Sequence, residues 1–148
     1  MLIMFSGTLL IPVIVSIIFS DNNLMTFIYS FFIILTIASI LYFPNIGINN
    51  TTDIKAKEGF LIVVSFWIIL SFFGSIPFMI DAQLSLNFVD ALFESISGWT
   101  TTGATILTNI DNLSPSILIY RQMLQWLGGM GIVVLALAVL PMLGVGGM

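Results

Sequence analysis

The sequence contains no cysteine and no histidine, and it has only three basic and seven acidic residues in a length of 148. Without cysteine there is no disulfide, thiolate metal site or cysteine nucleophile, and without histidine the commonest general base and zinc ligand is missing. Three basic residues cannot form the positive surface that nucleic acids require. The charged share is 7%, against about 25% in soluble domains. These shortages exclude a soluble enzyme and a nucleic-acid binder, and no catalytic residue or cofactor is expected.

Long hydrophobic runs are what the sequence does have, and hydrophobic residues make up 59% of it. A helix needs about 20 mostly apolar residues to cross a bilayer. Pro44 ends one such run, and Gly74 with Pro77 predicts a bend near the end of another. The sequence therefore predicts an all-α integral membrane protein with four spans, at residues 1–20, 24–43, 59–79 and 114–140.

The few basic residues predict how the chain is oriented. Lys55 and Lys57 share the polar segment 45–58, and loops that carry Lys and Arg face the cytoplasm. The N-terminus is then also cytoplasmic in this multi-pass protein. A signal peptide at the start is disfavoured, because the first run lacks a basic leader and a small-residue cleavage site. We divide the chain into a leading two-helix hairpin (1–44), a cytoplasmic loop (45–58) and a helix–loop–helix unit (59–148).

The segment between the third and fourth spans is predicted not to cross the membrane. Asn87 can cap a helix, Asp90 suits its first turn and Gly98 can end it. A helix over 87–98 is about 16 Å long, roughly half of a bilayer. The following residues, 100–105, include three successive threonines, which favour an extended backbone. A half-length helix followed by an extended segment is the layout of a re-entrant pore loop, with a pore helix at 87–98 and a filter at 100–105.

This layout suits a weakly hydrated monovalent cation. The helix descends from outside, so its partly negative C-terminal end points toward the middle of the membrane. Successive backbone carbonyls of the threonine segment can replace the hydration shell of K⁺. Gly103 allows backbone conformations with positive φ. Taken alone, however, a threonine–glycine run also fits a re-entrant structural hairpin or an interfacial helix.

The motifs FESISGWTTTGAT and RQMLQWLGGMGI, with KEGFLIVVSFWIILSFFGSIPF before them, resemble the first pore repeat of the TrkH family, the membrane subunits of bacterial Trk potassium uptake systems. The resemblance covers essentially all 148 residues. It implies a potassium-channel-like fold in which four repeats surround one pathway and each contributes a filter strand. In this chain the strand is Thr100, Thr101, Thr102 and Gly103, and the carbonyls of Thr101 and Thr102 are the expected strongest contacts to K⁺.

The resemblance also implies partners and a location. These are the lipid bilayer of the bacterial cytoplasmic (inner) membrane, a cytoplasmic nucleotide-binding TrkA-type regulatory subunit, and a homodimer of the complete protein. Only one repeat is present, and one strand cannot surround an ion. We expect the front part of a longer protein whose other repeats follow in the same chain. The alternatives are a non-conducting fragment or membrane assembly partner, and a homotetrameric single-repeat K⁺ channel.

Several further residues support this unit. Glu94 lies one turn before the filter on the same face as Asp90, and we interpret Glu94 as a hydrogen-bond anchor behind the filter rather than an ion ligand. For Arg121 we favour snorkelling or an ion pair over a direct role with the ion. Three glycines of the fourth span favour close helix packing over a hinge: Gly128, Gly129 and Gly131.

Overall fold

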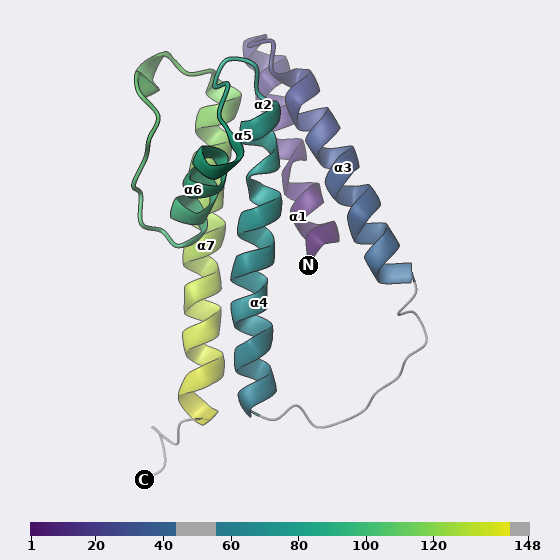
Figure 1. Ribbon diagram of the computed structural model, residues 1–148, viewed down its shortest axis with the longest axis vertical. Coiled ribbons are helices and arrows are strands. Elements are labelled where there is room, and N and C mark those ends of the chain that lie inside the picture. Colours follow the sequence, from purple (N-terminus) through teal and green to yellow (C-terminus); the bar gives the residue numbers. More distant parts are fainter. Residues whose placement is uncertain (44–55, 143–148) are drawn as a thin grey trace.

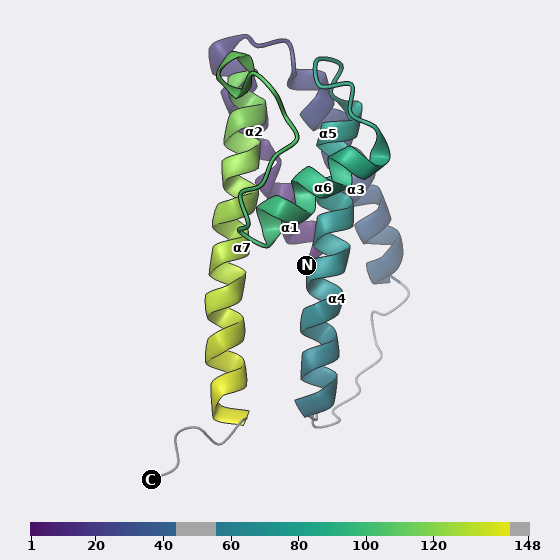
Figure 2. The ribbon, with the colours of Figure 1, turned by 60° about the vertical axis from the view of Figure 1, so that its left-hand side comes forward.

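The computed structural model describes residues 1–43 and 56–142, with side-chain surroundings for 1–43 and 61–133. Two long helices, α4 (Ala56–Gly74) and α7 (Pro115–Met142), run along its long axis. A shorter helix, α6 (Phe88–Trp99), packs against both of them in the upper half of Figure 1, and Figure 2 shows the same helix between them from another side. All elements in the described ranges are helices, as predicted.

The leading hairpin consists of α1 (Leu2–Thr8) and α2 (Leu10–Phe19) in line, followed by α3 (Leu24–Tyr42). The predicted first span is therefore interrupted at Leu9. Pro12 explains the interruption, since it has no N–H and its ring collides with the carbonyl of Thr8. The amide of Leu9 instead donates to the Ser6 carbonyl at 3.1 Å.

The third predicted span is formed by α4 and α5 (Ile76–Ile80), which are separated by Ser75. The helix is thus interrupted at the position where Gly74 and Pro77 predict a bend. The start of α4 differs from the prediction, because the helix begins at Ala56 rather than near residue 59. Three residues of the predicted cytoplasmic loop are therefore helical, as expected for good helix formers, and residues 45–55 lie outside the described ranges.

Three helical segments of the described ranges are long and apolar enough to span a membrane: Leu2–Phe19, Leu24–Tyr42 and Leu61–Ile80. The predicted fourth span corresponds to α7. With 28 residues it is long enough to span, although its first half carries Arg121, Gln122 and Gln125. Pro115 occupies its first position, where a missing N–H costs nothing, and the helix continues two residues beyond the predicted end.

Polar contacts tie the turn of the hairpin to the start of α7. The Asp21 carboxylate accepts from the Ser16 hydroxyl at 2.5 Å and from the Ser116 amide at 2.9 Å, while the Asn23 side chain donates to the Ser114 hydroxyl at 2.5 Å. Partial burial favours the neutral acid, but the hydrogen bonds from Ser116 and Ser16 outweigh it and lower the pKa of Asp21 below its usual value. The hairpin is therefore attached to the helix–loop–helix unit at one end of the bundle.

An aromatic cluster forms the core beneath these contacts. The ring of Tyr120 lies 5.5 Å from that of Phe27 and 5.1 Å from that of Phe78, centroid to centroid. All three side chains are fully buried. The Tyr120 hydroxyl donates to the Gly74 carbonyl at 2.8 Å. One residue of α7 thus joins α3, α4 and α5, and this fixes the frame that holds α6.

A candidate cation site on a re-entrant loop

The site begins with a well-capped helix. The Asn87 side chain accepts from the amide of Asp90 at 2.9 Å and donates to the Asp90 carboxylate at 2.8 Å, so both ends of its amide group are used. The helix α6 then runs through Trp99, one residue beyond the predicted end. The chain after it turns and returns to the end of the bundle from which α6 started (Figures 1 and 2).

Gly98 does not end α6, which corrects the prediction. It lies inside the helix, where a Cβ on it would approach the Cβ of Leu124 to 2.9 Å, so its small size serves packing against α7. The helix ends instead in a turn. The amide of Thr101 donates to the Gly98 carbonyl at 2.9 Å, and the amide of Thr102 donates to the Ser97 carbonyl at 3.0 Å. This pair of crossed bonds is the Schellman arrangement, which satisfies the last carbonyls of a helix.

The predicted extended backbone over 100–105 is therefore wrong at its first two residues. Thr100 has φ −84° and ψ 1°, and Thr101 has φ 56°, in the left-handed region. Helix termination overrides the β preference of threonine here, because the carbonyls of the last turn need donors. A left-handed conformation costs an L-residue about 1–2 kcal/mol, and for a β-branched residue it is rare. Such strain is typical of functional segments.

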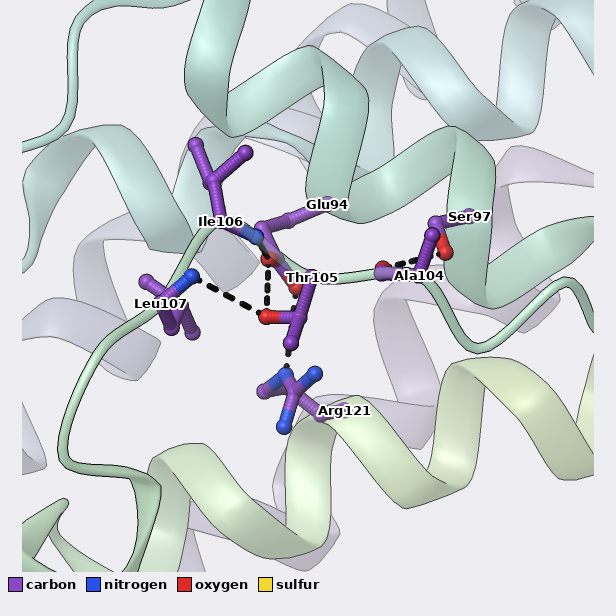
Figure 3. A network of polar contacts seen from close by, with 7 residues as sticks. All are labelled: Glu94, Ser97, Ala104, Thr105, Ile106, Leu107 and Arg121. Atoms are coloured by element: carbon purple, nitrogen blue, oxygen red, sulfur yellow. Dashed lines mark hydrogen bonds and ion pairs between the residues drawn. The ribbon is translucent and has the colours of Figure 1, made fainter.

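Figure 3 shows how the returning half of the loop is held. One oxygen of Glu94 accepts from the Ile106 amide at 2.8 Å and from the Thr105 hydroxyl, and its other oxygen pairs with the Arg121 guanidinium at 3.2 Å. The Ser97 hydroxyl donates to the Ala104 carbonyl at 2.6 Å. Glu94 is only 3% exposed. Its carboxylate is therefore fully engaged in bracing the loop, the arrangement expected for an anchor, and Arg121 forms the ion pair.

The four predicted filter residues lie together at the turn that follows α6. Residues 100–106 are all exposed. The Thr100 carbonyl accepts from the Thr101 hydroxyl at 2.7 Å. The carbonyls of Thr101, Thr102 and Gly103 accept no hydrogen bond from the part of the chain that the structure describes. Gly103 has φ 74°, and its surroundings are open, since a Cβ there would meet only the Gln125 side chain, at 3.9 Å. A glycine at position 103 is therefore favoured by the positive φ of its backbone, and not because a side chain there would collide with a neighbour.

Sequence reasoning missed Ser97, and it treated Thr105 only as part of the filter. Ser97 follows Glu94 by three residues, so both project from one face of α6. The spacing of Glu94 and Ser97 on one face of the helix was the available signal. The acceptor at Ala104 could not be foreseen, because it depends on how the chain folds back.

Apolar helices of membrane-spanning length, packed with a half-length helix and its exposed loop, define an all-α membrane protein. The sequence profile described as "TrkH: Cation transport protein" matches residues 22–148. The chain belongs to the TrkH family of cation transport proteins.

Individual relatives agree with this assignment. The Trk system potassium uptake protein TrkH of Escherichia coli (strain K12) is 51% identical over all 148 residues, and TrkG of the same organism is 38% identical over 144 residues, or 97% of the chain. The crystal structure of the potassium transporter TrkH from Vibrio parahaemolyticus superimposes with a TM-score of 0.90 at 46% identity, covering 99% of this chain and 31% of that one. The chain spans 30% of the length of the E. coli TrkH and 29% of TrkG.

Proposed function

We propose that this chain takes part in potassium uptake by supplying one of four filter strands, in which the backbone carbonyls of Thr101 and Thr102 are the main K⁺ ligands, with Thr100 and Gly103 completing the strand. The observation that carries the proposal is the turn after α6. The carbonyls of Thr101, Thr102 and Gly103 lack partners within the described residues, whereas the returning half of the loop is anchored by Glu94. The relatives named as potassium uptake proteins support the choice of ion.

The chemistry is selective coordination without a covalent step. A K⁺ ion that loses its water shell needs several oxygen ligands at once, and fixed carbonyl dipoles supply them. The C-terminal end of α6 adds partial negative charge at the same place. No carboxylate is needed at the ion, and Glu94, the acid of the last turns of α6, is already engaged with Arg121.

The rest of the proposal concerns the complete protein. The other filter strands come from further repeats, and the unit that begins with α4 at Ala56 is the first of them, preceded by the hairpin at 1–44 and a cytoplasmic segment that leads to α4. From Lys55 and Lys57, on either side of the first residue of α4, we infer that this segment, and with it the N-terminus, faces the cytoplasmic side of the bacterial inner membrane. A TrkA-type nucleotide-binding subunit and a second copy of the complete protein are the proposed partners.

The test is Gly103→Val in the complete protein, with Gly7→Val as the control. A valine at 103 cannot keep φ 74° without strain, so the strand rearranges. Gly7 is the penultimate residue of α1, and a Cβ there meets nothing within 4 Å. We expect Gly103→Val to abolish K⁺ uptake, or its preference over Na⁺, in cells without other K⁺ uptake systems, at an unchanged membrane level. Unchanged uptake and selectivity would contradict the filter assignment.

A measurement on the isolated chain distinguishes this proposal from the alternatives of a homotetrameric channel and a non-conducting assembly partner. One exposed strand cannot enclose an ion, so the purified 148-residue chain in liposomes is expected to pass no K⁺. A K⁺-selective flux from this chain alone would instead support a homotetrameric pore. An absence of K⁺ uptake by the complete protein would support a non-conducting assembly role.

A further inference from the structure

Gly128 of α7 lies directly against the backbone at the end of α6. A Cβ placed on Gly128 would be 2.2 Å from the carbonyl oxygen of Trp99 and 2.8 Å from its carbonyl carbon. Atoms at such separations overlap strongly, and both belong to the backbone, so no side-chain rotation relieves the contact. Even the smallest substitution at Gly128 must move α7 or the last turn of α6.

The last turn of α6 is held from its other sides as well. The Trp99 side chain is 2% exposed and its ring lies 5.6 Å from that of Phe5 and 6.2 Å from that of Phe66, centroid to centroid. On the α4 side, a Cβ on Gly74 would come within 2.9 Å of the Trp99 ring nitrogen. The Trp99 ring is thus contacted by α1 and approached by α4, and an apolar cavity of about 190 Å³ lies beside it, lined by Phe5, Phe66 and Leu70 among others.

The neighbouring glycines of α7 are not equivalent to Gly128. A Cβ on Gly129 would lie 3.7 Å from the Thr101 methyl group, and a Cβ on Gly131 would lie 3.6 Å from the Trp67 ring. Both are ordinary van der Waals distances. Of the three glycines that the sequence singles out, Gly128 alone has the close approach, and its contact is one residue before the turn.

We propose that Gly128 is a positioning residue for ion selectivity: its lack of a side chain sets how close α7 comes to Trp99, and so fixes the depth and orientation of the Thr100–Gly103 turn. The proposal rests on the proposed function of that turn. Displacement of the Trp99 carbonyl moves Thr100 directly and shifts the carbonyls of Thr101 and Thr102 away from a common axis. The first effect we expect is a lower preference for K⁺ over Na⁺, because discrimination between the two ions depends on the placement and number of these oxygens.

The experiment compares Gly128→Ala with Gly129→Ala in the complete protein. Rb⁺ uptake, as a K⁺ substitute, is measured in competition with K⁺ and with Na⁺, at matched membrane levels. We expect Gly128→Ala to reduce the preference for K⁺ over Na⁺ by about tenfold, equivalent to roughly 1.4 kcal/mol of differential binding, and Gly129→Ala to stay within about twofold. A wild-type preference in Gly128→Ala overturns the inference.

A second variant covers the case in which Gly128→Ala does not reach the membrane. Gly98→Ala should move α6 and α7 apart by less than Gly128→Ala does. Its Cβ would lie 2.9 Å from the Leu124 Cβ, whereas a Cβ on Gly128 would lie 2.2 Å from the Trp99 carbonyl oxygen. A reduced K⁺ preference in Gly98→Ala supports the inference, and an unchanged preference at a normal membrane level overturns it. If the unmodified protein itself shows no K⁺ preference, the proposed function fails, a result distinct from equal preferences in wild type and variants.

Discussion

The two halves of the loop after α6 are built in opposite ways. The returning half, 104–107, is tied to α6 through Ser97 and Glu94, and through Glu94 to α7. The first half, 100–103, uses its amides to end the helix and leaves three carbonyls without partners among the described residues. A ligand site needs this division, because oxygens can be kept free for an ion only if neighbouring contacts hold them in place. Substitutions at Glu94 and Ser97 weaken the anchoring of residues 104–107. Substitutions at Thr101 and Thr102 change the backbone of residues 100–103.

The largest effect is expected from Glu94→Ala. The change removes the acceptor of the Ile106 amide and leaves Arg121, whose side chain is 10% exposed, without its ion-pair partner. Breaking a buried ion pair from one side costs about 3–5 kcal/mol. Thermal unfolding of the purified complete protein in detergent measures the loss, and K⁺ uptake should fall with it.

Asp90→Ala is the matched control, one turn earlier on the same helix. Asp90 bonds to Asn87 through its side chain and has no partner on the loop among the described contacts. Its replacement should cost no more than about 1 kcal/mol. Equal destabilisation by the two substitutions would show that Glu94 does not brace the loop.

A smaller effect is expected from Ser97→Ala, which removes the bond from the Ser97 hydroxyl to the Ala104 carbonyl. The loss of one such bond is worth about 1 kcal/mol. Ser95 offers the contrast, because its buried hydroxyl has no partner within the described residues. Ser95→Ala should therefore be neutral or stabilising, since an unsatisfied polar group is removed. If both variants change the unfolding temperature in the same direction, the loop is not held through Ser97.

The smallest effect concerns the first half of the loop. Thr101→Gly removes the strain of the left-handed backbone at φ 56° but gives the unfolded chain more backbone entropy. The first effect exceeds the second, so we expect the free energy of unfolding to rise by about 0.5 kcal/mol. Thr102→Gly relieves nothing, as Thr102 is not among the residues with positive φ, and should destabilise by about 0.5–1 kcal/mol. Melting curves of both variants test this sign difference, and a loss of stability in Thr101→Gly would contradict the strain assigned to it.

The sequence predicts the helices well because their signals are local. Long apolar runs, Pro44, Gly74 and Pro77 mark spans and bends without reference to the rest of the chain. The predicted anchor at Glu94 and ion pair at Arg121 follow from the cost of burying charge. That these two residues pair with each other depends on α6 packing against α7, which no local pattern encodes. The conformation of Thr100 and Thr101 differs from the predicted extended one for a related reason. The last carbonyls of α6 accept hydrogen bonds from the amides of Thr101 and Thr102, and these bonds require a turn.

The contact between Asp21 and the amide of Ser116 joins residues that are 95 positions apart. The first turn of a helix has backbone amides without intrahelical partners and carries partial positive charge. A carboxylate there accepts hydrogen bonds from the amides and interacts favourably with the charge. For α7 that carboxylate comes from the hairpin at the other end of the chain. The hairpin leaves the ribosome before α7 does, so the carboxylate that completes the start of α7 is synthesised ahead of it. A hairpin that inserted wrongly would leave the Ser116 amide of α7 without this acceptor.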